Sequence, residues 1–176
     1  MSWSLSEALE TIQAFIDSGG PVLLAISALT FILWTLIFER IWYYRGPLRG
    51  EVKSTMAAWE ARPERKSWNA HQIRTAMISR ISEGVRANLD MIGTITALCP
   101  LFGLLGTVSG MIEVFQVLST TGGADAKSMA GGVKQATIPT MAGMVAAISG
   151  VFGGTIVNQI AMREEKLVED HLTMDH

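Results

Sequence analysis

Three long stretches without a single Asp, Glu, Lys or Arg constrain this chain more than any other feature. They are residues 18–38, 91–112 and 135–162, with 21, 22 and 28 residues, and the 14 basic and 16 acidic residues all lie outside them. The hydrocarbon core of a bilayer is about 30 Å thick and needs roughly 20 apolar residues in a helix. Each stretch is therefore long enough to cross a membrane. A buried helix in a soluble protein is the alternative, but little else in a chain of 176 residues could cover three of them.

The composition excludes several other classes of protein. Only 17% of the residues are charged, whereas soluble domains have about 25%. A single cysteine excludes a disulfide scaffold, and a net charge of −2 gives no bulk attraction for nucleic acid. The three histidines lack metal-ligand spacing, and no nucleophile and general base can be paired. We therefore expect neither an enzyme nor a cofactor or metal site.

We predict an all-α membrane protein whose three transmembrane helices extend into a cytoplasmic helical bundle and assemble into a ring-forming oligomer. An N-terminal amphipathic helix on the outer leaflet is expected from apolar residues at helical spacing, with a disordered tail as the alternative. The expected segments are the periplasmic amphipathic helix 1–17, the first span 18–44, the cytoplasmic helical loop 45–90, the second span 91–117, the periplasmic loop 118–134, the third span 135–162 and the C-terminal helix 163–176.

The orientation follows from the distribution of Lys and Arg. The loop between the first two stretches and the C-terminal tail carry 12 basic residues, whereas the N-terminus and the other loop carry 2. The positive-inside rule then places the long loop and the C-terminus in the cytoplasm and the N-terminus on the outer side of the membrane. Within the long loop, helices are expected over 51–61 and 73–89, with a break near Pro63. The first span is expected to run on into this loop, and the second loop helix to run on into the second span.

The second and third stretches each place small and hydroxyl-bearing residues on one helix face. Packing between helices explains the glycines, but polar groups deep in a span favour a bundle interior or water. A ring whose second and third helices line a central space would use both faces. The candidate pore-lining residues are Gly103, Thr107, Gly110, Thr137, Thr140, Ala147 and Asn158, and the candidate helix-packing residues are Gly106, Gly143, Gly150 and Gly154.

Two further residues are candidates for a channel mouth. Glu113 lies three residues beyond Gly110 and Gln135 begins the third stretch. A solvated carboxylate at the membrane interface is the simpler interpretation of Glu113.

The second stretch resembles a known family. Residues 100–111, Pro-Leu-Phe-Gly-Leu-Leu-Gly-Thr-Val-Ser-Gly-Met, are similar to the second-span signature of the MotA/TolQ/ExbB proton-channel family. Residues 135–148 with Asn158 resemble the third span of that family. The long basic loop and the charged C-terminal helix match as well, so the resemblance covers nearly the whole chain.

The resemblance implies a pentameric ring that holds the single-span helices of a smaller partner such as ExbD. In the family, the partner supplies the proton-carrying aspartate, and proton flow drives motion that, in the ExbB branch, energises TonB for uptake of iron complexes or vitamins. Thr107 and Thr140 align with the hydroxyl residues that face this site. The implied location is the inner membrane of a bacterium.

This chain departs from the family pattern at two places. Gln135 stands where many members have Glu, so an acidic pore residue is not carried over, and it stays open whether Glu113 takes its place. Pro139 beside Thr140 is unusual. The length favours a short ExbB-like protein, and the fourth span of MotA relatives is missing. A TolQ-type subunit for envelope maintenance and a non-conducting membrane scaffold are the alternatives.

Overall fold

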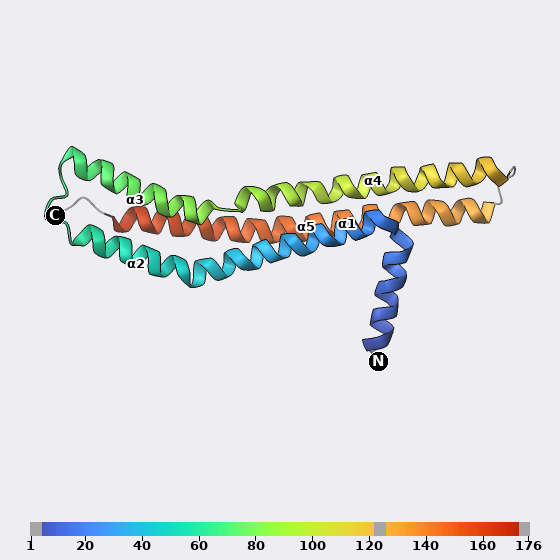
Figure 1. The fold of residues 1–176 in the computed structure, drawn as a ribbon, viewed down its shortest axis with the longest axis horizontal. Coiled ribbons are helices and arrows are strands. Elements are labelled where there is room, and N and C mark those ends of the chain that lie inside the picture. The colour runs from blue at the N-terminus through green and yellow to red at the C-terminus, as the bar shows by residue number, and fades with distance from the viewer. Residues whose placement is uncertain (1–4, 122–125, 173–176) are drawn as a thin grey trace. The chain divides into compact units, whose positions relative to one another are not determined.

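The computed structural model describes residues 5–121 and 126–172, and within them all side chains except those of 5–9, 11–18, 121, 126–129 and 135. This part of the chain folds into helices (Figure 1), and the described residues contain no strand. In chain order the helices are α1 (Leu5–Arg45), α2 (Pro47–Glu60), α3 (Trp68–Arg86), α4 (Leu89–Thr121) and α5 (Ala126–His171). The prediction of an all-helical chain is confirmed for the described residues.

Three helical stretches are long and apolar enough to cross a membrane. They lie within residues 19–60, 68–120 and 130–171, and each contains most or all of one charge-free stretch of the sequence. Length and composition of the observed helices thus agree with three membrane-spanning segments.

The chain divides into two compact units, which are described separately. The first unit comprises residues 1–33 and 94–151, and therefore the first part of α1, most of α4 and the first half of α5. Its core is formed by Ile26, Cys99 and Ala146, one residue from each helix, with partly buried apolar neighbours around them. Outward-facing residues of the same helices are large and apolar, among them Leu104 and Val145 at 58% and 67% exposure. Such a surface suits lipid rather than water.

A kink interrupts α1 inside the first unit. Gly20 has a φ of 63° and non-helical backbone angles, and Pro21 follows it. A left-handed φ is accessible to glycine without the steric penalty of a Cβ atom, and proline suits the first turn of the helix that resumes there. The residues before the kink are helical from Leu5, but the expected amphipathic face of segment 1–17 rests on side chains outside the described residues.

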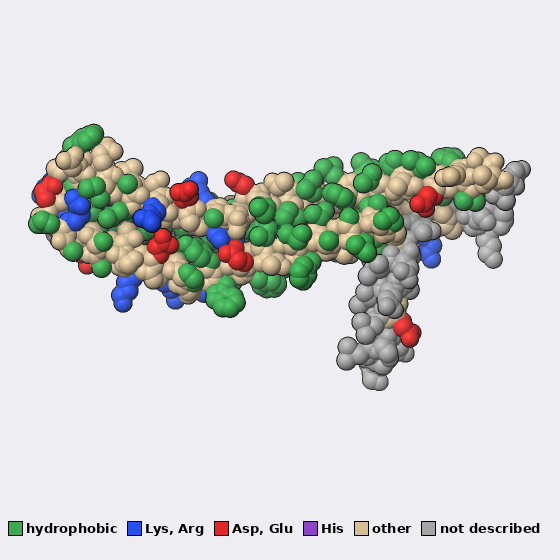
Figure 2. Space-filling view, viewed as in Figure 1, with side chains coloured by type: hydrophobic (Ala, Val, Ile, Leu, Met, Phe, Trp, Pro, Cys, Tyr) green, Lys and Arg blue, Asp and Glu red, His purple; other side chains and the backbone are tan. Residues whose placement is uncertain are grey.

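The second unit comprises residues 34–93 and 152–176 and contains the charged part of the molecule. The end of α1, all of α2 and α3, the start of α4 and the end of α5 belong to it. Figure 2 shows that most of the blue and red side chains lie on these elements. Its buried apolar residues come from every one of its helical segments and include Ile37, Leu48, Trp59, Val85, Ile92, Val157 and Leu172.

The helices of the second unit break at three places. Residues 61–67, around Pro63, are non-helical, and Ser67 then caps α3 by accepting a hydrogen bond from the Ala70 amide at 3.2 Å. The first span was expected to run on into the loop as far as a turn near Pro63. The helix does resume as α2, but only after a break at Gly46, because Pro47 lacks an N–H to continue the hydrogen-bond ladder of α1, which ends at Arg45.

The third break separates α3 from α4. A helix running directly from the loop into the second span was expected, but Asn88 adopts a φ of 63° and the helical hydrogen bonding stops. Asparagine tolerates the left-handed region better than other side chains do. The second span therefore begins as a new helix at Leu89.

Candidate functional site

The backbones of α4 and α5 approach each other closely within the first unit. A methyl group added at Gly143 would lie 2.5 Å from the carbonyl oxygen of Cys99, and one added at Gly103 would lie 3.0 Å from Thr140 Cα. In both cases the obstacle is backbone, which cannot move aside as a flexible side chain can. These two glycines therefore set the helix separation, as small residues do between membrane helices.

Two more glycines of α4 continue this contact. Gly106 packs against the ring of Pro139, and a methyl group at Gly110 would lie 2.7 Å from the Cβ atom of Ala136. Pro139 is buried, so the unusual proline of the third stretch fills the space that Gly106 leaves. The sequence marks Pro139 as unusual but does not indicate its packing partner. The three- and four-residue spacing of the α4 glycines is the pattern that predicts a close helix contact at this place.

A hydrogen bond crosses between α4 and α5 at this point. The Thr140 hydroxyl donates to the backbone carbonyl of Gly103 at 2.8 Å, over a sequence separation of 37 residues. Thr140 is half-buried, and its partner is a residue of the close contact. The hydroxyl is therefore held in one orientation, with its proton directed at α4 and its lone pairs still able to accept.

The other hydroxyl candidates donate to their own helices. Thr107 donates to the Leu104 carbonyl at 2.7 Å and Thr137 to the Lys134 carbonyl at 2.8 Å. Each backbone acceptor lies three residues earlier in the same helix. Such local bonds satisfy the hydroxyl proton inside a span, and they leave only oxygen lone pairs for a group approaching from outside.

The remaining predicted site residues differ in burial and are divided between the two units. Gly150 is buried against Thr96 and Leu33, whereas Ala147 is half-buried beside the core of the first unit. Gly154 and Asn158 belong to the second unit, in which Gly154 packs against Ile92 and Asn158 is exposed.

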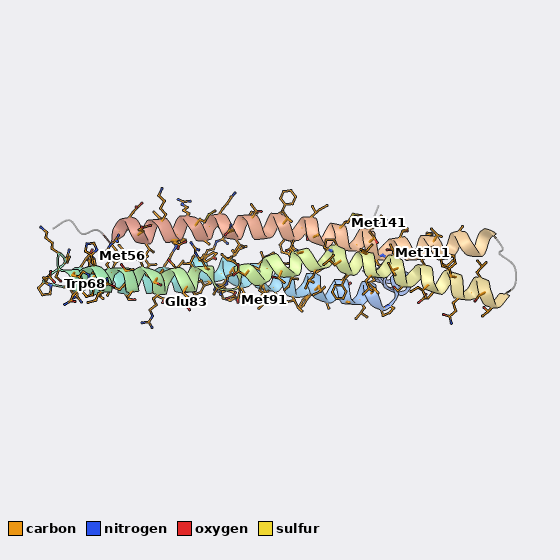
Figure 3. All side chains as sticks on the ribbon, turned by 90° about the horizontal axis from the view of Figure 1, so that it is seen from above. Met56, Trp68, Glu83, Met91, Met111 and Met141 are labelled. Atoms are coloured by element: carbon orange, nitrogen blue, oxygen red, sulfur yellow. The ribbon has the colours of Figure 1, made fainter. Side chains whose placement is uncertain are left out.

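The two candidates for a channel mouth remain without an observed role. Glu113 is exposed on α4. Gln135 lies in α5, but its side chain is outside the described residues. Figure 3 shows Met111 and Met141, which mark the neighbouring parts of α4 and α5.

The described residues do not form a cluster of side chains that could bind a metal ion. Among residues 5–121 and 126–172, no group of three His, Cys, Asp or Glu side chains could hold a metal ion. The chemistry that the site offers is therefore that of hydroxyl groups, backbone carbonyls and close helix packing.

In the second unit, side chains from neighbouring helices hold the ends of α3 and α5. Arg40 donates to the Gly84 carbonyl at 3.0 Å, and Tyr44 donates to the Val85 carbonyl at 2.8 Å. Arg74 donates to the carbonyls of Glu169 and Leu172 near the end of α5. The last carbonyls of a helix have no partner within it, so these side chains supply the missing donors.

One exposed ion pair also links α3 to α5. Arg86 and Glu165 approach to 2.8 Å, with three hydrogen bonds between guanidinium and carboxylate. These bonds hold the pKa of Glu165 below its usual value and raise the pKa of Arg86. The pair is open to solvent, so its role is to orient the two helices more than to stabilise them.

Together these features define an all-helical membrane protein in which two glycine-rich spans pack closely around hydroxyl groups. The sequence profile of the MotA/TolQ/ExbB proton channel family matches residues 47–170. The chain belongs to this family. No curated protein and no solved structure matched it.

Proposed function

We propose that this protein is the ring-forming channel subunit of a proton-driven complex of the ExbB kind in a bacterial inner membrane. With an ExbD-like single-span partner, it would convert proton motive force into work on a TonB-like protein. That work would drive uptake of iron complexes or vitamins across the outer membrane. Membership of the proton-channel family supports the channel role, and the resemblance of residues 100–111 to the family's second-span signature supports the choice of this kind of subunit.

The absence of a carboxylate from the second and third spans supports the need for a partner protein. Residues 91–112 and 135–162 contain no Asp or Glu, so these spans offer no group that can carry a proton as a carboxyl does. A partner helix with an intramembrane Asp would supply it. Small residues on α4 and α5 suit the close approach of such a helix, and a pentameric ring would enclose it.

The hydroxyl geometry favours one protonation state of that carboxyl group. Because Thr107 and Thr137 donate their protons to backbone carbonyls, they present acceptors to a visiting group. A protonated Asp is a donor, whereas an ionised Asp can only accept. These positions would therefore stabilise the neutral, proton-loaded carboxyl while it passes through the span.

The single observation that carries the proposal is the Thr140–Gly103 hydrogen bond, because it fixes a hydroxyl at the α4–α5 contact inside the family signature. The orientation proposed from the Lys and Arg distribution places the N-terminus in the periplasm and the C-terminus in the cytoplasm.

The test is proton flux into liposomes that contain the protein with the partner that co-purifies from native membranes. Thr107→Val and Thr140→Val should reduce the flux at least tenfold while the oligomer still assembles. Thr140→Ser should retain most of the flux, because it keeps the hydroxyl.

Thr30→Val is the matched control, since the Thr30 hydroxyl donates to the Ile26 carbonyl of its own helix, α1. It should leave the flux unchanged. Equal flux through the wild type and both α4–α5 variants would overturn the pathway role.

A non-conducting scaffold is the second candidate, favoured by the fact that the hydroxyls of Thr107, Thr137 and Thr140 all donate to backbone carbonyls. Under that reading the complex passes no protons in the liposome assay. A TolQ-type role in envelope maintenance would instead be indicated by a co-purifying partner of the Tol system.

A further inference from the structure

A continuous stripe of exposed side chains runs from the end of α1 into α2. It consists of Phe38, Trp42, Arg45 and Arg49, which we call the α1–α2 stripe. At 100° per residue, the three members in α1, Phe38, Trp42 and Arg45, fall within about 60° of one another, and Arg49 is exposed at the start of α2. The buried residues of the same segment lie on another face and are Ile37, Arg40, Tyr44 and Leu48. On both sides of the turn at Gly46, exposed and buried residues alternate: Arg45 and Arg49 are exposed, whereas Tyr44 and Leu48 are buried.

The aromatic part of the stripe has the character of a membrane interface. Phe38 is 62% and Trp42 is 78% exposed, which is unusual for large apolar side chains unless lipid or another molecule covers them. Phe38 is the last residue of the first charge-free stretch. Tryptophan is enriched at the boundary between hydrocarbon and headgroups. The stripe therefore begins where the first span leaves the hydrocarbon.

The two arginines that follow have no partner. Arg45 and Arg49 are exposed, and neither side chain forms a hydrogen bond or ion pair with any residue in the described part of the chain. Nearby carboxylates do not compensate them, because Glu39 pairs with Arg40 and Glu51 accepts a hydrogen bond from Tyr43. Two guanidinium groups are thus left to bind an external anion.

Their height above the hydrocarbon matches the headgroup layer. At 1.5 Å per residue, Arg45 lies about 4.5 Å beyond Trp42 along the axis of α1, and Arg49 follows in the first turn of α2, directly after the turn at Gly46. The headgroup layer is roughly 5–8 Å thick on each side, and arginine side chains bend toward such an interface. Lys53 lies on the same face of α2 as Arg49, about 6 Å farther along that helix, and is therefore farther from the hydrocarbon.

We propose that the α1–α2 stripe binds the headgroup of an anionic phospholipid, with Arg45 and Arg49 on the phosphate and Trp42 beside the acyl chains. Guanidinium groups bind phosphate oxygens in a bidentate geometry. The exposed aromatic residues make the stripe continuous with the lipid-facing surface of the span, which favours a lipid over an acidic protein segment. This inference requires only that α1 crosses a membrane and does not depend on proton conduction.

Native mass spectrometry of the detergent-solubilised protein can test the proposal. Dioleoylphosphatidylglycerol, which is anionic, and dioleoylphosphatidylcholine, which is zwitterionic, are titrated separately, so that the acyl chains are the same and only the headgroup differs. The wild type should retain the anionic lipid at least fivefold more tightly. Each basic residue near an anionic surface contributes about a fivefold effect, so the Arg45→Gln/Arg49→Gln variant should lose this preference.

Two controls separate the stripe from general charge. Lys53→Gln removes a charge from the same face of α2 but farther from the hydrocarbon, and Lys66→Gln/Arg80→Gln removes two exposed charges elsewhere. Both should keep the preference. Loss of the preference in either control, no preference in the wild type, or displacement of the lipid by millimolar inorganic phosphate would overturn the proposal. Preferential retention of an acidic peptide in place of the lipid would do the same.

Discussion

The hydroxyl of Thr140 on α5 donates a hydrogen bond to the backbone carbonyl of Gly103 on α4 at 2.8 Å. A methyl group at Gly103 would lie 3.0 Å from Thr140 Cα, so the bond and the close packing depend on each other. Substitutions at either residue should therefore affect both.

Thr140→Val should lower the free energy of unfolding by about 0.5–1.5 kcal/mol, because one intramolecular hydrogen bond is lost. Thr140→Ser should lose less, since its hydroxyl can still reach Gly103. Denaturant unfolding in a mild detergent, followed by circular dichroism, measures both variants. Equal losses for valine and serine would show that the threonine methyl group, and not the hydroxyl, stabilises the contact.

Gly143→Ala should destabilise the protein by about 1–3 kcal/mol, the usual cost of overpacking. The added methyl group would meet the Cys99 carbonyl oxygen at 2.5 Å and force the helices apart. Gly131→Ala is the control on the same helix, because a methyl group there meets nothing within 4 Å. Thermal unfolding should show a lower midpoint for the first variant and an unchanged or higher midpoint for the second.

Tyr44→Phe should cost about 1 kcal/mol, because the buried Val85 carbonyl loses its donor. The Tyr44 side chain is buried, and its hydroxyl bond to this carbonyl is 2.8 Å long. Tyr43→Phe removes an exposed bond to Glu51 and should have a smaller effect. Denaturant unfolding compares the two, and a larger loss for Tyr43→Phe would contradict the assigned role of Tyr44.

Arg74→Gln should loosen the end of α5. Arg74 donates to the carbonyls of Glu169 and Leu172, which lie in and just beyond the last turn of that helix. Hydrogen exchange of amides 168–172 should become faster, whereas Arg80→Gln, which removes an exposed charge from the same helix, should leave it unchanged. Unaltered exchange in Arg74→Gln would show that the cap contributes nothing to local stability.

The Arg86–Glu165 pair should give a small pH dependence. The pKa of Glu165 is lowered by its hydrogen bonds to Arg86, so the folded state binds the proton more weakly than the unfolded state. The stabilisation is therefore complete above the unfolded-state pKa of about 4.3 and is lost as the pH falls through the lowered value. The difference in unfolding midpoint between wild type and Glu165→Gln should be small at pH 7 and should vanish in acid. A difference that grows in acid would contradict this assignment.

Much of the fold could be predicted because its strongest signals are local. Charge-free stretches of about 20 residues report membrane crossing directly, and the break around Pro63 follows from the missing proline N–H. The breaks at Gly46 and Asn88 were not expected. Asn88 adopts a left-handed backbone conformation. Most asparagines do not, so the presence of an asparagine does not by itself predict a helix break.

The candidate site was less predictable than the fold. Periodicity places Gly103 and Thr140 on helix faces, but their hydrogen bond depends on the relative register of two helices separated by 37 residues in sequence. The same limit applies to Arg40 and Tyr44 on α1, which donate hydrogen bonds to backbone carbonyls near the end of α3. No pattern in the sequence indicates that these residues lie close together. Contacts between a side chain and a distant backbone group leave no trace in composition or spacing.

The left-handed Asn88 has a mechanical consequence. A continuous helix resists twisting because every turn is joined to the next by hydrogen bonds, whereas the link between α3 and α4 consists of single-bond torsions at Ala87 and Asn88. The end of α3 is anchored to α1 through Arg40 and Tyr44. The hydrogen-bond ladder of α3 therefore ends before α4 begins, so a twist in the first turn of α4 is not transmitted along that ladder into α3.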